Sequence, residues 1–353
     1  MTTYSEFTLA AVQAAPVYFD REASTEKACQ LIEAAAQKGA TIAAFGETWL
    51  PGYPFFHSVG QSPLRTKAAT EYLANAVEIP SRTTDRLCTA ARRAGIDVVI
   101  GVVERDKRTH GTVYCTLLFI SREGKILGRH RKLKPTGTER SIWGDGDGVG
   151  LTVYELPYGT ISGLNCWEHM MLLPAYALMA QGTQIHIAAW PGLHGVSKGL
   201  LLSQAFAVQA GCYVIAVGSL RLREHVPERY RELHKSDNTG NSCIIDPQGE
   251  VIAGPVVGEE AILTAHGSLE KVLEAKSTRD IGGHYSRPDV LQLVVHRRPL
   301  ERVIESGDVD ATVRSVVDGP ADSTSRALAF TPDKDWENQK EELSSKIKVK
   351  QAR

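Results

Sequence analysis

Apolar segments alternate with helical segments in the first part of the chain. Residues 9–13 have the character of a buried strand, residues 24–37 predict a helix, and residues 41–45 predict a second strand. Hydroxyl side chains favour helix N-termini, and glycine favours the left-handed conformation that ends many helices. The expected caps of this helix are Ser24 or Thr25 at its start and Gly39 at its end.

A second unit of the same kind is predicted later in the chain. Residues 161–164 and 185–189 have strand character, and residues 172–180 predict the helix between them. The helix-to-strand junction at residues 36–44 resembles the one at residues 180–188. Any junction of helix, glycine and strand has a similar sequence. An internal repeat and a coincidence of local patterns therefore explain the similarity equally well.

The intervening and following segments add antiparallel pairs to these units. Residues 84–94 predict a helix and residues 98–103 a strand, and hairpins are predicted over residues 113–130 and 242–253. Strands linked through helices pair in parallel, whereas hairpins pair antiparallel. The pattern therefore predicts an α/β fold of two packed mixed sheets with helices outside, a four-layer α-β-β-α sandwich.

One large domain followed by a tail is the expected organisation. The chain has 353 residues, and single α/β domains of roughly two to three hundred residues are common. From about residue 300 the apolar content falls, and charges crowd into residues 333–353. Such a segment has too few large apolar residues to bury a core of its own. We expect a domain over residues 1–300 and a tail over residues 301–353 that is disordered alone or contacts a neighbouring subunit.

Composition and charge exclude several classes of partner. Hydrophobic residues make up 42% of the chain and charged residues 23%, and the net charge is −1, so neither nucleic acid nor an anionic membrane is an expected partner. Every apolar run is far shorter than the roughly 20 residues of a membrane helix, and no basic leader precedes the first strand. We expect a soluble, cytoplasmic protein.

Cys166 is the first candidate for chemistry. The six cysteines include no C-x-x-C pair, so neither a disulfide framework nor a zinc site is indicated, and five of them are expected to be small buried residues. Cys166 instead stands where a strand ends and a helix is expected to begin. Backbone N–H groups at such a turn and a nearby cation favour a thiolate, which lowers the thiol pKa from about 8.5.

Three motifs at predicted strand ends narrow the interpretation. They read F-G-E-T-W-L-P-G-Y-P around Glu47, G-R-H-R-K-L-K-P-T around Lys132 with E-R-S-I-W-G-D-G-D-G from Glu139, and G-L-N-C-W-E-H around Cys166. In this order, and with H-Y-S-R-P-D from His284, they resemble the nitrilase branch of the nitrilase (carbon-nitrogen hydrolase) superfamily. The resemblance covers roughly residues 5–300 and implies the nitrilase-like sandwich.

The resemblance also implies roles for these residues. Glu47 would be the general base, Lys132 the cation that stabilises developing negative charge, and Cys166 the nucleophile. Glu139 matches a further acidic position that positions the lysine or assists proton transfer, the alternative being a surface residue of a loop. The backbone N–H of Trp167 would complete the anion site. No metal ion and no organic cofactor is expected.

The chemistry of nitrile hydrolysis requires the same residue types. A nitrile carbon is a weak electrophile, so attack on it needs a strong soft nucleophile, a base and a donor for the charge that forms. The expected reaction passes through a thioimidate and a thioester to a carboxylic acid and ammonia. An amidase or a nitrile or cyanide hydratase of the same superfamily, and more remotely a non-catalytic assembly protein on the same fold, are the alternatives.

Large rings beside the motifs are candidates for the substrate-binding wall, although such rings more often pack in the core. The candidates are Trp49, Tyr53, Trp143, Trp167, His169 and Trp190. The chain departs from the usual family sequence at Gly46, where proline is common, and at residues 170–174, which read M-M-L-L-P. The first departure should leave the chemistry intact, and the second would alter the pocket or a dimer face.

The expected partners are a small nitrile, water and further copies of the chain. Members of the family associate through helices near the nucleophile and often extend into spirals through insertions and C-terminal tails. The resemblance therefore implies dimers that extend to larger homo-oligomers or helical filaments, with residues 333–353 as a contact.

Overall fold

A six-stranded sheet forms the first half of the fold. The structure is a computed structural model that describes residues 4–193 and 198–303. The strand order is β13 (Ala261–Ser268), β1 (Glu6–Gln13), β2 (Ile42–Phe45), β3 (Asp97–Arg105), β4 (Val113–Ile120) and β5 (Ile126–Arg131). Strands β1, β2 and β3 are parallel, and β13, β4 and β5 pair antiparallel at the two edges.

The second sheet repeats this arrangement. Its order is β10 (Leu220–Arg221), β11 (Asn238–Ile245), β9 (Tyr213–Gly218), β8 (Ile185–Trp190), β7 (Gly159–Asn165) and β6 (Tyr154–Leu156), with β12 (Val251–Val257) paired to β11. Strands β7, β8 and β9 are parallel, and the others pair antiparallel. The predicted mixed sheets and both predicted hairpins, β4–β5 and β11–β12, are confirmed.

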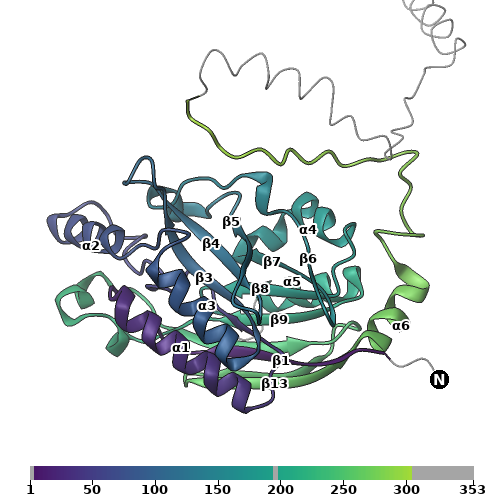
Figure 1. The fold of residues 1–353 in the computed structure, drawn as a ribbon. Helices are drawn as coiled ribbons and strands as arrows, with labels where there is room; N and C mark the ends of the chain where they lie inside the picture. Colours follow the sequence, from purple (N-terminus) through teal and green to yellow (C-terminus); the bar gives the residue numbers. More distant parts are fainter. Residues whose placement is uncertain (1–3, 194–197, 304–353) are drawn as a thin grey trace, which may run out of the picture. The chain divides into compact units, whose positions relative to one another are not determined.

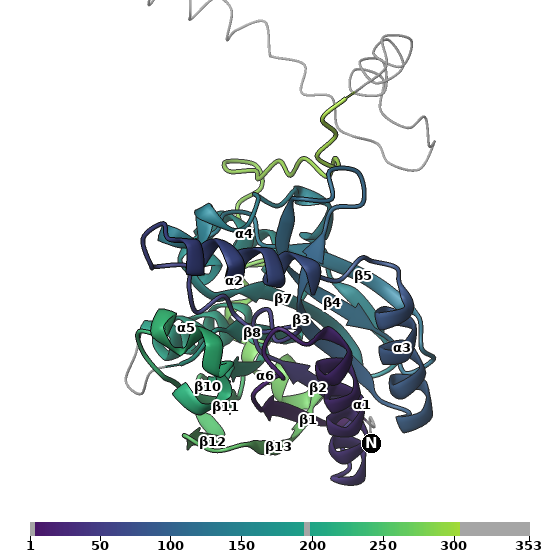
Figure 2. The same ribbon diagram turned by 90° about the vertical axis from the view of Figure 1, so that its left-hand side faces the viewer.

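Helices cover the outer face of each sheet. Helices α1 (Arg21–Gln37) and α3 (Arg82–Ala94) pack on the first sheet, and α4 (Leu172–Met179) and α5 (Lys198–Ala210) pack on the second (Figures 1 and 2). The result is the predicted four-layer α-β-β-α sandwich. The remaining helices are α2 (Pro63–Ala74), α6 (Leu269–Arg279) and the short 3-10 helices η1 (Gly137–Ser141), η2 (Gly148–Gly150), η3 (Cys166–Met170), η4 (Arg223–His225) and η5 (Glu228–Leu233).

The start of α1 differs from the prediction. Its N-cap is Asp20, whose side chain accepts the N–H of Ala23 at 2.9 Å, so the helix begins before the predicted Ser24 or Thr25. Ser24 lies inside the first turn and donates its hydroxyl to Val17 O. The end matches more closely, because Gly39 follows the C-cap with φ of 80°.

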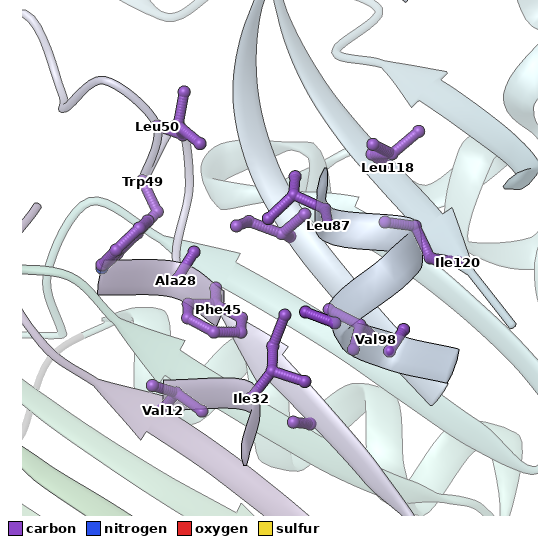
Figure 3. Packing of buried hydrophobic residues seen from close by; sticks show 14 of the residues in the cluster. Val12, Ala28, Ile32, Phe45, Trp49, Leu50, Leu87, Val98, Leu118 and Ile120 are labelled. Carbon is purple, nitrogen blue, oxygen red and sulfur yellow. The ribbon is translucent and has the colours of Figure 1, made fainter. Parts of the chain in front are cut away.

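Both faces of each sheet are apolar because both are covered. In β1, Leu9 and Ala11 face the second sheet, whereas Ala10 and Val12 face the helices. Figure 3 shows the helix side of this packing, with side chains of α1, α3 and the sheet interlocked. This double burial explains why the central strands are apolar without alternation.

Two glycines, Gly46 and Gly101, allow the backbone just before Glu47 to lie close to the segments on either side of it. A Cβ atom on Gly101 of β3 would lie 2.1 Å from Gly46 O, and a Cβ atom on Gly46 would lie 2.1 Å from Ser219 Oγ. Ser219 follows β9 of the other sheet. The backbone of Gly46 is therefore the point at which the two sheets meet beside the site.

The described residues up to 300 form one compact unit. The tail predicted over residues 301–353 lies outside the described residues except for 301–303. No helix in the described ranges is long and apolar enough to span a membrane.

Candidate active site

The four predicted catalytic residues come together from separate strand ends. Glu47 follows β2, Lys132 follows β5, Cys166 follows β7, and Glu139 lies in η1. One carboxylate oxygen of each glutamate and the Cys166 sulfur all lie within 4.8 Å of one another. All four residues are buried. Glu139 therefore points into the site, although Thr138 and Arg140 on either side of it are exposed.

An ion cluster occupies the centre of this group. Lys132 Nζ donates to Glu47 Oε1 at 2.7 Å and to Glu139 Oε2 at 2.8 Å. Glu139 also accepts the Tyr53 hydroxyl at 2.6 Å and the Thr136 N–H at 2.7 Å. One ammonium thus bridges two carboxylates, and the partners of Glu139 hold it in place.

The two carboxylate oxygens of Glu47 differ in their hydrogen-bond partners. Its Oε1 accepts from Lys132 and, at 3.4 Å, from the Cys115 thiol of β4. Its Oε2 is buried and has no hydrogen-bond partner within the described residues. The Cys166 sulfur lies in the same 4.8 Å cluster as a Glu47 oxygen, so this carboxylate is close enough to act on the thiol.

Burial sets the protonation of this cluster. Desolvation and the neighbouring Glu139 charge raise the pKa of Glu47 to about 7, against the lowering effect of Lys132. Burial alone would lower the pKa of Lys132, but Glu47, Cys166, Cys115 and Glu139 together hold it well above its usual range. The lysine is therefore a permanent cation, and the glutamate changes its charge near neutral pH.

The predicted lowering of the Cys166 pKa is wrong. Burial and the Glu47 charge raise the pKa of this thiol well above its usual value, and the opposing effects of Lys132 and the Trp167 N–H are smaller. The resting sulfur is therefore a thiol that must lose its proton to a base, and Glu47 is adjacent.

The backbone around Cys166 is folded sharply. Cys166 has φ of 53°, the left-handed region that non-glycine residues rarely occupy. The turn begins a five-residue 3-10 helix, η3, and the helix predicted over residues 172–180 follows it as α4. The sharp turn at Cys166 aims the Trp167 N–H at the sulfur, and its part in an anion site stays a prediction.

Glu168 ties two catalytic segments together and was not predicted from the sequence. Its carboxylate accepts the N–H of Leu133 and the N–H of Asn165, both at 2.8 Å, and contacts His130 Nε2 at 3.0 Å. Leu133 follows Lys132, and Asn165 precedes Cys166. One buried anion therefore fixes the spacing between the cation and the thiol. The only signal for it in the sequence is its place within C-W-E-H.

Two of the predicted wall residues lie elsewhere. Trp49 is fully buried, packs on Phe45 in the cluster between the first sheet and its helices, and donates to Ala14 O at 2.8 Å (Figure 3). His169 has both ring nitrogens occupied, by Cys166 O at 2.7 Å and by His186 at 3.0 Å. Trp49 therefore faces the helix-covered core, and neither ring nitrogen of His169 is available to a substrate.

The other rings surround the cluster in supporting positions. The Tyr53 hydroxyl holds Glu139, and Trp143 lies 5.5 Å below the Lys132 ammonium. Trp190 is buried against His169, and Trp167, at 36% exposure, meets the edge of Trp190. Contact of Tyr53, Trp167 or Trp190 with a substrate stays a prediction.

The same acidic groups were tested as a metal site. Within the described ranges, Glu47, Glu139 and Cys166 are the residues grouped closely enough to ligate an ion. The position between the two carboxylates is occupied by the Lys132 ammonium, which binds both. The donor set therefore fits a protein cation better than a metal ion.

Comparison with known proteins identifies the family. The model of the carbon-nitrogen hydrolase family matches residues 8–277. The chain is 55% identical over 312 residues to Nitrilase 2 of an unknown prokaryotic organism, with 88% of this chain and 99% of that protein covered. It is 37% identical over 307 residues to a bifunctional nitrilase/nitrile hydratase of Lupinus angustifolius, with 83% and 86% covered. The chain belongs to the carbon-nitrogen hydrolase family.

Solved structures agree with the fold. Saccharomyces cerevisiae Nit3, a member of branch 10 of the nitrilase superfamily, superimposes with a TM-score of 0.64 at 20% identity, over 78% of this chain and 94% of that one. The protein is a hydrolase of carbon-nitrogen bonds with the nitrilase-like sandwich, and its curated relatives are nitrilases.

The pKa of Glu47 predicts the pH dependence of the enzyme. A base works only when deprotonated, so kcat/KM should rise with pH through a midpoint near 7. Because Glu47 interacts with Lys132 and Glu139, this midpoint is a property of the three groups together. The Glu139 charge raises this pKa, so the residual activity of Glu139→Gln should have its midpoint at lower pH. Initial rates across neutral pH test both statements. A flat profile, or a midpoint that moves up in the variant, would contradict them.

Proposed function

We propose that this carbon-nitrogen hydrolase is a nitrilase that converts an organic nitrile to the carboxylic acid and ammonia. The observation that carries the proposal is the buried set of Glu47, Lys132, Glu139 and Cys166, in which a base, a cation and a nucleophile meet. The nitrilases among the relatives support the choice of nitriles over other carbon-nitrogen bonds.

The first step joins the substrate to the enzyme. Glu47 Oε2 takes the Cys166 proton as the sulfur forms a bond to the nitrile carbon, and the nitrogen gains that proton, which leaves a neutral thioimidate. Lys132 and the Trp167 N–H stabilise the negative charge that passes from sulfur to nitrogen. A thiol that loses its proton only to Glu47 fits its raised pKa.

Two water molecules complete the reaction. Glu47 removes a proton from the first water as it adds to the thioimidate carbon and gives that proton to the nitrogen. Glu47 then moves the remaining hydroxyl proton to the nitrogen as the carbon-nitrogen bond breaks, so that ammonia leaves and a thioester remains. The second water adds in the same way, and the carbon-sulfur bond breaks to release the acid and restore the thiol. Lys132 again holds the charge on the oxygen. Glu139 acts by holding the ammonium from its far side.

Release of an amide is the second candidate outcome. If the tetrahedral intermediate formed by the first water loses sulfur before nitrogen, the product is the amide, as in a nitrile hydratase. The bifunctional relative from Lupinus angustifolius favours testing for it. Chromatography of acid and amide from the same reaction separates the two outcomes, and a panel of aliphatic and aromatic nitriles identifies the substrate class.

Replacement of the nucleophile tests the proposal directly. Cys166→Ala and Cys166→Ser should show no measurable ammonia release while remaining folded, because the nucleophile is absent or is a hydroxyl that ionises far less readily. Cys88→Ser is the control, since Cys88 is half-buried on α3, and it should retain activity. Turnover by Cys166→Ser at a rate near that of the control would refute the role of the sulfur.

Replacement of Lys132 tests the cation. Lys132→Ala should lose about 10² to 10³ or more in kcat, because both the anion donor and the partner of two buried carboxylates disappear. Lys132→Arg should also fail, because a planar guanidinium does not fit the site of a compact ammonium between Glu47 and Glu139. Steady-state kinetics on the best nitrile measure both. A nearly normal rate for Lys132→Arg would show that the compact ammonium of Lys132 is not required for catalysis.

We also propose that the chain self-associates through the apolar surface around α4. This helix contains no charged residue, and Leu172 and Leu173 are 75% and 64% exposed. Beside them lies an apolar groove of about 480 Å³ whose lining includes Pro174 and Val295. A helix that is apolar on every face is normally buried, so a second copy is the proposed cover.

The double variant Leu172→Glu, Leu173→Glu should therefore dissociate the oligomer. Sedimentation velocity should show a smaller species than the wild type, because two carboxylates cannot be buried in an apolar interface. Leu273→Glu on α6, which is 49% exposed, is the control and should sediment like the wild type. Unchanged sedimentation of the double variant would place the interface elsewhere.

Absence of nucleic-acid and membrane partners and the cytoplasmic location stay predictions.

A further inference from the structure

A row of buried polar side chains runs behind Cys166 and takes no part in the proposed chemistry. Thr183 contacts Ser162, and Ser162 Oγ contacts His186 Nδ1 at 2.8 Å. His186 Nε2 lies 3.0 Å from His169 Nε2, and His169 Nδ1 lies 2.7 Å from Cys166 O. The four side chains are at most 6% exposed. The row links the middle of β7 and the start of β8 to the backbone of the nucleophile.

Only one arrangement of hydrogens satisfies every contact in this row. A carbonyl oxygen can only accept, so His169 must donate its Nδ1–H to Cys166 O. Burial lowers the pKa of His169 to about 4 and that of His186 well below its usual range, so both rings are neutral at pH 7. His169 Nε2 is then an acceptor, and His186 must donate to it. His186 Nδ1 in turn accepts from Ser162, and Ser162 accepts from Thr183. All donors therefore point toward Cys166.

The end of the row controls a peptide group with two roles. The accepting carbonyl of Cys166 and the N–H of Trp167 belong to the same planar trans peptide, so they point in opposite directions. His169 holds the oxygen on one side, and the N–H on the other side is aimed at the Cys166 sulfur. Rotation of this peptide would move both groups together.

We propose that the one-way hydrogen-bond row Thr183–Ser162–His186–His169 orients the Cys166–Trp167 peptide, and that His169 and His186 are positioning residues for the anion-stabilising N–H of Trp167. The row also restrains Cys166 in its left-handed conformation, which residues other than glycine rarely adopt. The proposal rests on the proposed function, because the N–H stabilises the thiolate and the thioimidate-forming transition state.

The alternative is that these histidines are only packed core residues. The His186 ring is stacked on Phe206 with centroids 3.7 Å apart, and His169 is stacked on Trp190 at 5.2 Å. Packing and hydrogen bonding can be separated at position 186. His186→Phe keeps an aromatic ring against Phe206 but loses the donor to His169. His186→Gln loses the ring but keeps an N–H that can reach His169.

The experiment compares these variants by nitrile kinetics and by the alkylation rate of Cys166 with iodoacetamide. His186→Phe should lower kcat about tenfold or more with KM changed less than about threefold, because a misaligned donor weakens the transition state more than the ground state. Alkylation of Cys166 should slow by a similar factor, since its thiolate loses a hydrogen bond while Glu47, Lys132 and Glu139 still face it. His186→Gln should recover most of both losses.

Phe206→Leu is the matched control for packing. It removes the stacked ring but leaves the whole row of hydrogen bonds, so its kcat and alkylation rate should stay within about threefold of the wild type even if it melts earlier. The proposal is overturned if Phe206→Leu reproduces the kinetic loss of His186→Phe. It is equally overturned if His186→Phe is kinetically normal, or if His186→Gln is no better than His186→Phe.

A measurement on the wild-type protein covers the case in which the variants fail to fold. In nitrogen-15 spectra of histidine-labelled protein at neutral pH, the signals assigned to His169 and His186 among the eleven histidines should show neutral rings protonated at Nδ1 and at Nε2, respectively. Any other pair of tautomers would overturn the direction of the row. If the wild type hydrolyses no nitrile, the proposed function fails, whereas alkylation rates and tautomers still decide the role of the row.

Discussion

The lysine ammonium shared by two carboxylates, all three buried, is the interaction on which the site depends. Loss of one partner from a buried ion group typically costs about 3–5 kcal/mol, because an unpaired charge is left in the interior. In this protein two carboxylates face one ammonium, so the group carries an excess of negative charge. Burial, with the Glu139 charge added to it, raises the pKa of Glu47, and the neighbouring anionic groups hold Lys132 charged against the effect of its own burial. The same burial that makes the cluster costly to disrupt therefore also makes the glutamate a stronger base.

The ion cluster and the nucleophile belong to different halves of the fold. Glu47 and Lys132 follow strands of the first sheet, and Cys166 follows a strand of the second. Their separation therefore depends on how the sheets pack, and Glu168 adds a direct link between the segments. A shift of one sheet against the other would separate base from thiol without breaking either sheet.

Much of this architecture could be predicted from the sequence. The central strands are buried on both faces, which leaves continuous apolar runs, and functional residues stand at the ends of those runs. The position of Cys166 was predictable for this reason, and so were those of Glu47 and Lys132. The direction of the thiol pKa was not, because the sequence shows which charged groups are neighbours but not how deeply they are buried. Cys115 was missed because it lies inside a strand of apolar residues.

The motif C-W-E-H shows the same limit of prediction from sequence, because neighbours in the chain need not face the same way. Within one turn of 3-10 helix, Cys166 faces the ion cluster, Glu168 faces the preceding strand ends and His169 faces the second sheet. Adjacency to the nucleophile suggested that His169 touches substrate, yet the tight turn places it behind the backbone. Trp49 was misassigned in the same way, because its position in the chain is close to Glu47 whereas its ring points into the helix-covered core.

Gly46 limits how the segment before the proposed base can be altered. A Cβ atom on Gly46 would meet Ser219 of the other sheet, and a Cβ atom on Gly101 would meet the Gly46 carbonyl. Neither glycine can therefore gain a side chain without a shift of the backbone around it. Because Glu47 follows Gly46 directly, such a shift would displace the proposed base.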